Sequence, residues 1–262
     1  MGLSNNVIES LSNELMEAQE TRVPVVSLAQ RYPEMDLSDA YRIQLRTLDR
    51  RVAAGAMVIG AKVGFTSLAT QQQFGVSEPV AGLLLNSTVY RERADIPTSL
   101  FVSPRIEPEI AFVLGEDLEG PGVTVARALQ ATAGLMPAIE LVDLRIQGRS
   151  ATALDVTADS AGGWGLVLGG GLTPVHRVDP RVVGVALSRN GEVIATGTGA
   201  AALGNPAEVL AWLANRLATL GLSLKRGHVV ITGSLVRAEP VTPGDTFSAT
   251  FSCLGSVSAR FA

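Results

Sequence analysis

The sequence predicts an α+β protein in which a helical N-terminal region precedes a body made mainly of short strands. Up to residue 56 the apolar residues recur at helical spacing, and from residue 57 they form short apolar runs between glycine, proline and asparagine residues. No internal repeat and no low-complexity linker is found along the chain. We therefore divide it into a helical N-terminal region, residues 1–56, and a mixed β-rich body, residues 57–262, that is one continuous structural unit.

Two helices are expected in the N-terminal region. Ser4 can cap the first, and its apolar stripe consists of Val7, Ile8, Leu11 and Leu15. The second begins near residue 37 and ends at Gly55. Its apolar stripe consists of Tyr41, Leu45, Leu48 and Val52.

The body is expected to hold strands and one long helix. The strands expected are residues 57–64, 109–114, 138–142, 165–168, 182–188, 229–232, 247–251 and 257–261. Asn190-Gly191 predicts a two-residue hairpin turn, because this pair tolerates positive φ angles. Asn205 and Pro206 predict the start of a helix that ends at Gly221, and a shorter helix is expected near residues 124–132.

Composition excludes several classes of protein. The hydrophobic content of 47% supports a large core, and a net charge of −4 without a Lys/Arg-rich run argues against nucleic acid or an anionic membrane as partner. The single cysteine excludes a disulfide framework and a multi-cysteine zinc site, and two histidines leave little for histidine-based chemistry. Since neither a signal peptide nor a run of about 18 apolar residues is present, we expect a cytoplasmic protein.

Three carboxylates stand out because they interrupt apolar strands. Glu107 and Glu109 lie two residues apart in one run, and Glu140 lies in another. Residues two apart on a strand face the same way at a spacing of roughly 6.6 Å, so the first two side chains can converge and the third can complete the set. Oxygen ligands of this kind suit Mg²⁺ or Mn²⁺. The alternative is that they face solvent on a half-exposed strand.

Several runs together make the chain similar to a known family. They are residues 60–67 (GAKVGFTS), 73–79 (QFGVSEP), 104–114 (PRIEPEIAFVL), 137–143 (PAIELVD), 155–159 (DVTAD), 203–206 (LGNP), 212–215 (WLAN) and 255–261 (GSVSARF). In these runs, which follow in order over nearly the whole chain, the sequence resembles the 2-keto-4-pentenoate hydratases and 4-oxalocrotonate decarboxylases of the fumarylacetoacetate hydrolase superfamily.

The resemblance implies a fold and a metal site. The fold is the mixed β-roll or sandwich of the fumarylacetoacetate hydrolase C-terminal type, with a helical N-terminal region. The metal is Mg²⁺ or Mn²⁺, held by Glu107, Glu109 and Glu140, and the protein is a homo-oligomer. The resemblance also implies that Lys62 projects into the site as a catalytic group, where the alternative is a solvated lysine at a strand end.

Further site residues are expected, each with a structural alternative. Asp159 is a catalytic candidate that could instead cap a strand end, and Arg105 could bind a substrate carboxylate or form a surface ion pair. Ser160, Ser234 and Val80 are expected to line the substrate pocket, although a tight turn alone would also explain Ser234. Hydratases of the family usually have Asp where this chain has Val80, and Asp-Asn-Ala-Ser-Ser where it has residues 159–163 (DSAGG). Val80 favours a decarboxylase, whereas the other changes fit neither subgroup.

The resemblance implies a metal-dependent lyase that acts on small 2-hydroxydienoic or 2-oxo acids. The first expectation is hydration of 2-hydroxypenta-2,4-dienoate to 4-hydroxy-2-oxopentanoate through a metal-stabilised enolate. The second is decarboxylation of 4-oxalocrotonate, for which the same metal site would serve. Two further alternatives are C–C hydrolysis of an acylpyruvate and a non-catalytic partner subunit in a hydratase–decarboxylase complex.

Overall fold

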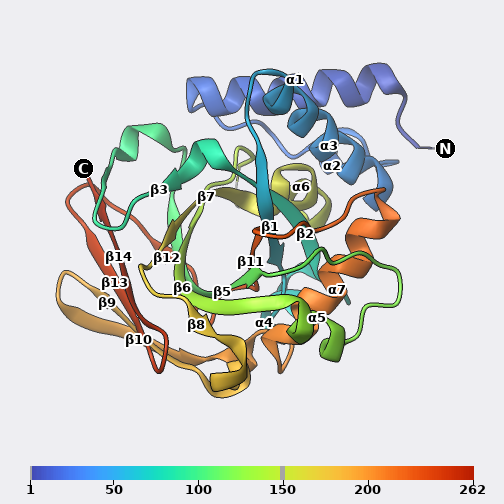
Figure 1. Ribbon diagram of the computed structural model, residues 1–262. Coiled ribbons are helices and arrows are strands. Elements are labelled where there is room, and N and C mark those ends of the chain that lie inside the picture. The colour runs from blue at the N-terminus through green and yellow to red at the C-terminus, as the bar shows by residue number, and fades with distance from the viewer. Residues whose placement is uncertain (1, 148–150) are drawn as a thin grey trace.

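A computed structural model describes residues 2–147 and 151–262 as an α+β fold with two sheets, as the sequence predicts (Figure 1). The helices are α1 (Asn5–Thr21), α2 (Leu28–Arg31), α3 (Leu37–Ala53), α4 (Leu68–Phe74), α5 (Val125–Ala131), α6 (Ala153–Ala158) and α7 (Pro206–Thr219). The strands are β1 (Val58–Gly64), β2 (Val80–Leu85), β3 (Val89–Tyr90), β4 (Asp95–Ile96), β5 (Arg105–Leu114), β6 (Thr132–Val142), β7 (Gly163–Leu168), β8 (Thr173–Pro174), β9 (Gly184–Arg189), β10 (Glu192–Thr198), β11 (Val229–Ile231), β12 (Glu239–Pro240), β13 (Thr246–Phe251) and β14 (Gly255–Phe261).

The larger sheet curls into a partial barrel. Its strands follow the order β2-β1-β11-β5-β6-β7-β3, with β12 added beside β5 and β8 beside β6. Strands β1 and β11 are parallel, as are β3 and β7, whereas β5 and β6 form a long antiparallel pair. The curl is visible in Figure 1, where the strands surround a central space and the N-terminal helices cover one end.

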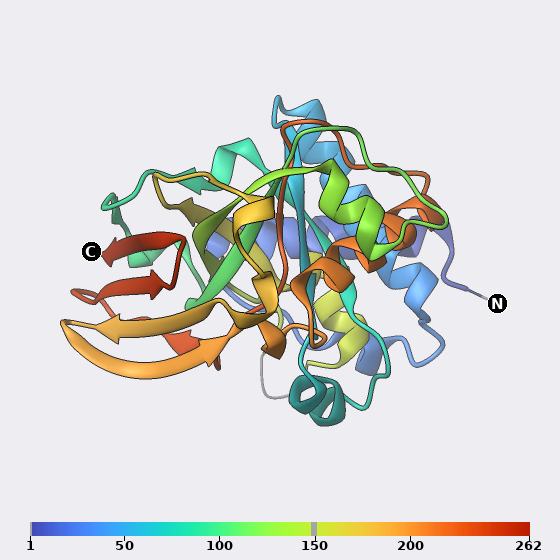
Figure 2. The ribbon, with the colours of Figure 1, turned by 60° about the horizontal axis from the view of Figure 1, so that its bottom comes forward.

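The smaller sheet has the order β10-β9-β13-β14-β4. Figures 1 and 2 show it on one side of the curled sheet, with helices α5 and α7 on the opposite side. The predicted turn at Asn190 and Gly191 joins β9 to β10, and both residues have positive φ angles. The main core fills the space between the curled sheet, α7 and the smaller sheet.

The first helix forms as its sequence predicts. Ser4 caps α1 by accepting a hydrogen bond from the Val7 amide. Of the predicted stripe, Ile8, Leu11 and Leu15 are buried and Val7 is half-buried. Helix α7 likewise begins at Pro206 after the Asn205 cap and ends just before Gly221, which has a φ of +71°. These ends follow from local capping chemistry, which sequence reveals directly.

Helix α3 has the predicted position, but of its predicted stripe only Tyr41 is buried, whereas Leu45 and Leu48 are half-buried. Asp36 and Asp39 form a capping box at its start, yet Val52 at its end is 45% exposed. The buried face instead includes Gln44 and Thr47. The Gln44 amide donates to the carbonyls of Ala81 and Thr157, and Thr47 contacts the Ser12 hydroxyl. Because these polar groups are hydrogen-bonded, they are buried at positions that an apolar stripe cannot identify.

None of the helices in the described part of the chain is long and apolar enough to cross a membrane.

Candidate metal centre

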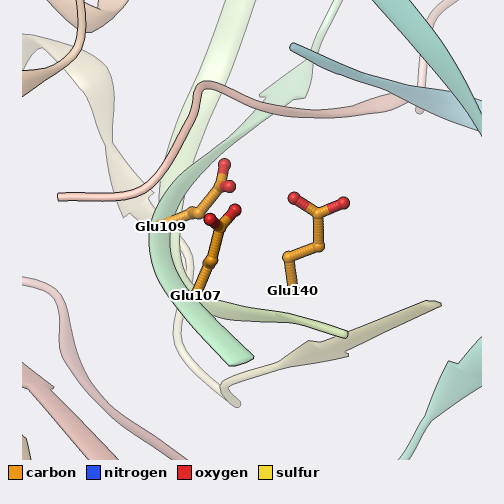
Figure 3. A group of neighbouring side chains, drawn as sticks. All are labelled: Glu107, Glu109 and Glu140. Carbon is orange, nitrogen blue, oxygen red and sulfur yellow. The ribbon is translucent and has the colours of Figure 1, made fainter. Parts of the chain in front are cut away.

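Three glutamates converge inside the curled sheet (Figure 3). Glu107 on β5 is directly opposite Glu140 on β6, and Glu109 lies two residues further along β5, so all three face the same side. One carboxylate oxygen of each lies within 4.8 Å of those of the other two. Glu109 and Glu140 are fully buried, and Glu107 is half-buried. The long β5–β6 pair therefore places the set that the sequence predicts.

The floor beneath the glutamates is apolar. Ala111 follows Glu109 on the same face of β5, and Ala138 precedes Glu140 on the same face of β6. Both belong to a buried cluster with Leu84, Leu166, Val229 and Ile231. The carboxylates thus have little water on this side, and ionising them there costs free energy unless positive charge lies nearby.

This setting raises the pKa of two of the carboxyl groups. Burial, together with the neighbouring Glu140, raises the pKa of Glu107 to about 7. Burial also raises the pKa of Glu109 well above its ordinary value, and the charges of Glu140 and Glu107 add to this effect. Like charges placed directly across a strand pair are destabilising. The cluster is therefore suited to bind a cation.

The oxygen atoms of the cluster fit a hard divalent cation. Within the described residues, Glu109 Oε1 and Glu140 Oε2 are buried with neither a hydrogen-bond nor an ion-pair partner, and Glu140 Oε1 has only the Lys62 ammonium group, 3.1 Å away. Glu109 Oε2 accepts a hydrogen bond from the Gly233 amide at 2.6 Å. Buried carboxylate oxygens are normally paired, and an oxygen-only set of three is typical of Mg²⁺ or Mn²⁺ rather than zinc. The unpaired atoms are thus what a metal-binding set requires.

Lys62 reaches the cluster from β1, on the other side of the curl. Its Nζ lies 3.1 Å from Glu140 Oε1, and the side chain is 3% exposed. Strands β11 and β5 separate β1 from β6, so in a flat sheet these two strands would be roughly 14 Å apart. The curl of the sheet brings the lysine and the glutamate together across the interior.

Lys62 is held in its charged form. Burial opposes the charge, but Glu140, Glu107 and Glu109 together outweigh burial and raise the pKa of Lys62 above its ordinary value. If a bound divalent cation displaced the protons of the glutamates, the three carboxylates and the ammonium group would together carry a net charge of −2, which the cation would neutralise.

A second contact of Lys62 is to the main chain. Its Nζ donates to the Ala161 carbonyl at 2.7 Å. The neighbouring Ser160 also faces this region, since a Cβ added at Gly82, opposite Lys62, would lie 2.4 Å from the Ser160 carbonyl oxygen. The carboxylate of Asp159 points instead to Arg145, with both Nε and the main-chain N–H at 2.7 Å. The predicted catalytic and pocket roles of Asp159 and Ser160 stay predictions.

The other predicted pocket residues lie around this centre at different depths. Val80 is the strand partner of Gly64 and faces the same side as Lys62, where it is buried against Phe65, Val156 and Ala161. Ser234 follows Gly233, and its hydroxyl is 3.4 Å from the Val236 amide. Arg105 is exposed at the start of β5 and donates to the Ala238 carbonyl at 3.2 Å. Arg105 thus lies at the rim.

Three groups at or next to the centre were not identified from the sequence. They are the Ala161 carbonyl, the Gly233 amide and the Arg145 side chain. The contacts of a main-chain carbonyl or amide cannot be predicted from the side chain that the residue carries. Arg145, however, stands between Leu144 and Ile146, and a charged residue within an apolar run is the same signal that identified Glu140.

The chain is similar to known proteins over nearly its whole length. A family model described as fumarylacetoacetate (FAA) hydrolase C-terminal matches residues 57–262. The chain is 37% identical over 253 residues to a 2-keto-4-pentenoate hydratase of Paraburkholderia xenovorans (strain LB400), a match covering 97% of this chain and 94% of the relative. It is 36% identical over 259 residues to a 4-oxalocrotonate decarboxylase of Pseudomonas sp. (strain CF600), covering 99% and 98%.

A solved structure agrees closely with the fold. The 4-oxalocrotonate decarboxylase from Pseudomonas putida G7, complexed with magnesium and adipate, has a TM-score of 0.96 at 33% identity, covering 99% of both chains. The similarity therefore includes a hydratase and a decarboxylase at almost equal sequence identity.

Proposed function

The chain belongs to the fumarylacetoacetate hydrolase family, among its hydratase and decarboxylase lyases, and from this premise we propose that it hydrates 2-hydroxypenta-2,4-dienoate to 4-hydroxy-2-oxopentanoate. The observation that carries the proposal is the set of Glu107, Glu109 and Glu140 beside Lys62, in which Glu109 Oε1 and Glu140 Oε2 are buried without a partner among the described residues. This set supports Mg²⁺ or Mn²⁺ as the cofactor. When bound, the cation would supply Lewis-acid stabilisation of negative charge on a substrate oxygen.

In this proposal Lys62 is the proton donor. The hydration requires a proton at the terminal carbon of the dienoate before water can add to the remaining double bond. Lys62 Nζ is protonated, buried and held by the Ala161 carbonyl, so it can present a proton to a substrate beside the glutamates. Its charge also favours an anionic substrate.

The remaining predicted residues have supporting roles in the proposal. Arg105 at the rim attracts the substrate carboxylate, and Ser160 and Ser234 line the pocket next to Lys62 and Gly233. Val80 supplies an apolar wall on the face that carries Lys62. Together these groups suit a small 2-oxo acid.

Decarboxylation of 4-oxalocrotonate is the second candidate. Two observations favour it: the TM-score of 0.96 to a 4-oxalocrotonate decarboxylase, and an apolar Val80 where a carboxylate could help to activate water. Loss of CO₂, and the ketonisation that precedes addition of water, both develop negative charge on the C2 oxygen of the substrate. Activity with each acid must therefore be measured side by side.

We also propose that the protein is a homo-oligomer. Strand β10 is at the edge of the smaller sheet and exposes Val193 (64%) and Ile194 (40%), which is unusual for an edge strand without a partner. Light scattering that gives the mass of a single 27.3-kDa chain would contradict this proposal.

A paired assay with a metal-site variant tests the function. With Mg²⁺ or Mn²⁺ present, we expect the absorbance of 2-hydroxypenta-2,4-dienoate to fall, and little release of CO₂ from 4-oxalocrotonate. Glu140→Gln removes a charge from the cluster and should abolish both metal binding, measured by calorimetry, and turnover. The control Glu116→Gln, on an exposed ion pair with Arg127, should change neither.

Turnover of the two acids and metal binding, measured together, distinguish the possible functions. Release of CO₂ without hydration would make the protein a decarboxylase. Metal binding without turnover of either acid would favour another 2-oxo acid, including an acylpyruvate, or a partner subunit. Full activity of Glu140→Gln in the presence of a chelator would rule out the metal centre itself.

A further inference from the structure

A buried arginine lies behind the segment that holds Lys62. Arg145 and Asp159 are each 3% exposed and form an ion pair. Arg145 Nε and its main-chain N–H donate to the two carboxylate oxygens of Asp159, both at 2.7 Å. The remaining guanidinium nitrogens donate to the main-chain carbonyls of Asp159 at 3.0 Å, Asp143 at 2.7 Å and Gly163 at 3.3 Å. One side chain therefore bonds both ends of the segment 159–163.

The segment between these ends has an unusual backbone. Ser160, Ala161 and Gly162 follow one another with φ angles of +54°, +54° and +73°. Only glycine adopts this region without cost, so the two other residues need support from their surroundings. The bonds of Arg145 to the carbonyls of Asp159 and Gly163 supply such support. This conformation is what points the Ala161 carbonyl at Lys62.

We propose that Arg145, together with Asp159, is a positioning residue that fixes the 160–162 turn and through the Ala161 carbonyl aims the Lys62 amine at the metal centre. The inference rests on the proposed function for its catalytic consequence. Arg145 does not touch the glutamates in the contacts described above; it acts through the turn. Asp159, expected to be catalytic, works in this view by orienting Arg145.

An arginine suits this position better than a lysine would. Its planar guanidinium can donate in several fixed directions at once, and here it bonds one carboxylate and three carbonyls. A lysine keeps the charge but cannot reproduce this geometry. Arg145→Lys is therefore a conservative variant that tests geometry apart from charge, and Arg145→Met tests loss of both.

A kinetic cycle tests whether Arg145 acts through Lys62. We expect Arg145→Met to lower kcat roughly 10- to 100-fold, as is usual for groups that orient catalytic residues, while KM and Mg²⁺ affinity change little. Lys62→Met should lower kcat by roughly 10²–10⁴. The double variant should be no slower than Lys62→Met alone, because two residues that act as one unit are not additive. Additive losses would overturn the proposal.

A matched control separates positioning from general stability. Arg189 and Asp245 form another arginine–aspartate pair that supports a turn, in the smaller sheet, with Arg189 Nη2 2.6 Å from Asp245 and the arginine side chain partly exposed. Arg189→Met should lower the unfolding temperature but not kcat. If its kcat fell as far as that of Arg145→Met, the loss at Arg145 would be a loss of folding and the proposal would fail.

A second readout needs no turnover. The chain has two lysines, the buried Lys62 and Lys225, whose side chain is 53% exposed. In metal-free protein, labelling with an amine-reactive acetylating reagent, followed by mass spectrometry, gives the ratio of the two rates. We expect this ratio to rise several-fold in Arg145→Met, to rise less in Arg145→Lys, and to stay unchanged in Arg189→Met.

The labelling ratio and the enzyme activity test different parts of the proposal. An unchanged labelling ratio in Arg145→Met overturns the positioning role whatever the enzyme's substrate. A raised ratio in a protein that acts on neither acid would support the positioning role while the proposed function fails. If Arg145→Met does not fold, Arg145→Lys and Asp159→Asn, which keep the side-chain volume, are measured instead with the same expected direction.

Discussion

Glu107 and Glu140 lie directly opposite each other on neighbouring strands, an arrangement that costs free energy unless a cation lies between them. The sequence already indicated a bound cation, because burying a glutamate within an apolar run costs free energy unless a partner offsets its charge. The burial of Glu140 removes the alternative of a solvent-facing residue. The metal-ligand role of the three glutamates stays a prediction that the Glu140→Gln variant tests.

Val80 is the residue at which reaction type can be probed. It is two residues from Gly82, the strand partner of Lys62, and shares the face of Lys62. We expect Val80→Asp to raise the rate of hydration roughly tenfold or more, since a positioned acid or base contributes about 10²–10⁴-fold. The carboxylate would also be buried among apolar groups, so the free energy of unfolding should fall by about 1–3 kcal/mol.

Val80→Asn is the control for Val80→Asp, because it has the same shape without the charge. Both variants are assayed for absorbance loss of 2-hydroxypenta-2,4-dienoate and unfolded with urea. Equal hydration rates in the two variants would show that a carboxylate at position 80 does not limit the reaction.

Among the helices and strands, the sequence best predicts those whose ends are marked by capping or turn residues. Helices α1, α3, α5 and α7 and the strands β1, β9 and β11 lie at or close to the expected residues. Strand β2 was not predicted, although residues 80–85 (VAGLLL) form an apolar run after Pro79. Helices α4 and α6, of seven and six residues, were also missed, because so short a stretch shows little periodicity.

The turn between β9 and β10 depends on Asp245, which lies directly before strand β13. Asp245 accepts hydrogen bonds from Arg189, Asn190 and Thr242, and is 4% exposed. Asp245→Asn should lower the free energy of unfolding in urea by about 1–3 kcal/mol at neutral pH. Asp95→Asn, which breaks an exposed pair with Arg260, should change it by less than about 1 kcal/mol.

The effect of Asp245 has a defined pH dependence. Burial opposes its charge, but hydrogen bonds from Arg189 and Thr242 outweigh burial and hold the pKa of Asp245 well below its ordinary value. Its contribution is therefore complete above the unfolded pKa, near 3.8, and is lost as pH falls through the folded value. The difference between wild type and Asp245→Asn should shrink in urea titrations below that pH. A difference that grows on acidification would contradict this assignment.

At the scale of the whole molecule, the site depends on features that no local pattern encodes. The curl of the sheet brings Lys62 to Glu140 across two intervening strands, and the turn at residues 160–162 brings a carbonyl to the same lysine. Both arise from long-range packing. The sequence alone identified the three glutamates as a candidate metal-binding set, and the family resemblance added Lys62 to the site.

The N-terminal helices are attached to the body close to this site. Asp155 in α6 is fully buried and accepts hydrogen bonds from the Ser27 hydroxyl at 2.7 Å and the amides of Leu28 and Ala29 at 2.7 and 3.2 Å. Helix α6 leads directly into Asp159 and the turn. The boundary at residue 56 between the two predicted regions stays a prediction, but their contact at Asp155 is direct.

Asp155→Ala tests this attachment. It leaves buried donors unpaired, so the free energy of unfolding should fall by at least about 1–3 kcal/mol in urea, and activity should fall with it. Asp179→Ala removes an exposed carboxylate that bonds Arg181 two residues away, and should have no measurable effect. Equal stability of the two variants would show that the helices are held mainly by their apolar contacts.

The turn that holds Lys62 has a further consequence for how the site can be mapped. Its contact is a main-chain carbonyl, and the residue that provides it is already alanine, so alanine scanning cannot detect Ala161. Only a change to the backbone itself, such as an insertion or an amide-to-ester replacement in the turn, would reveal how much the enzyme depends on it.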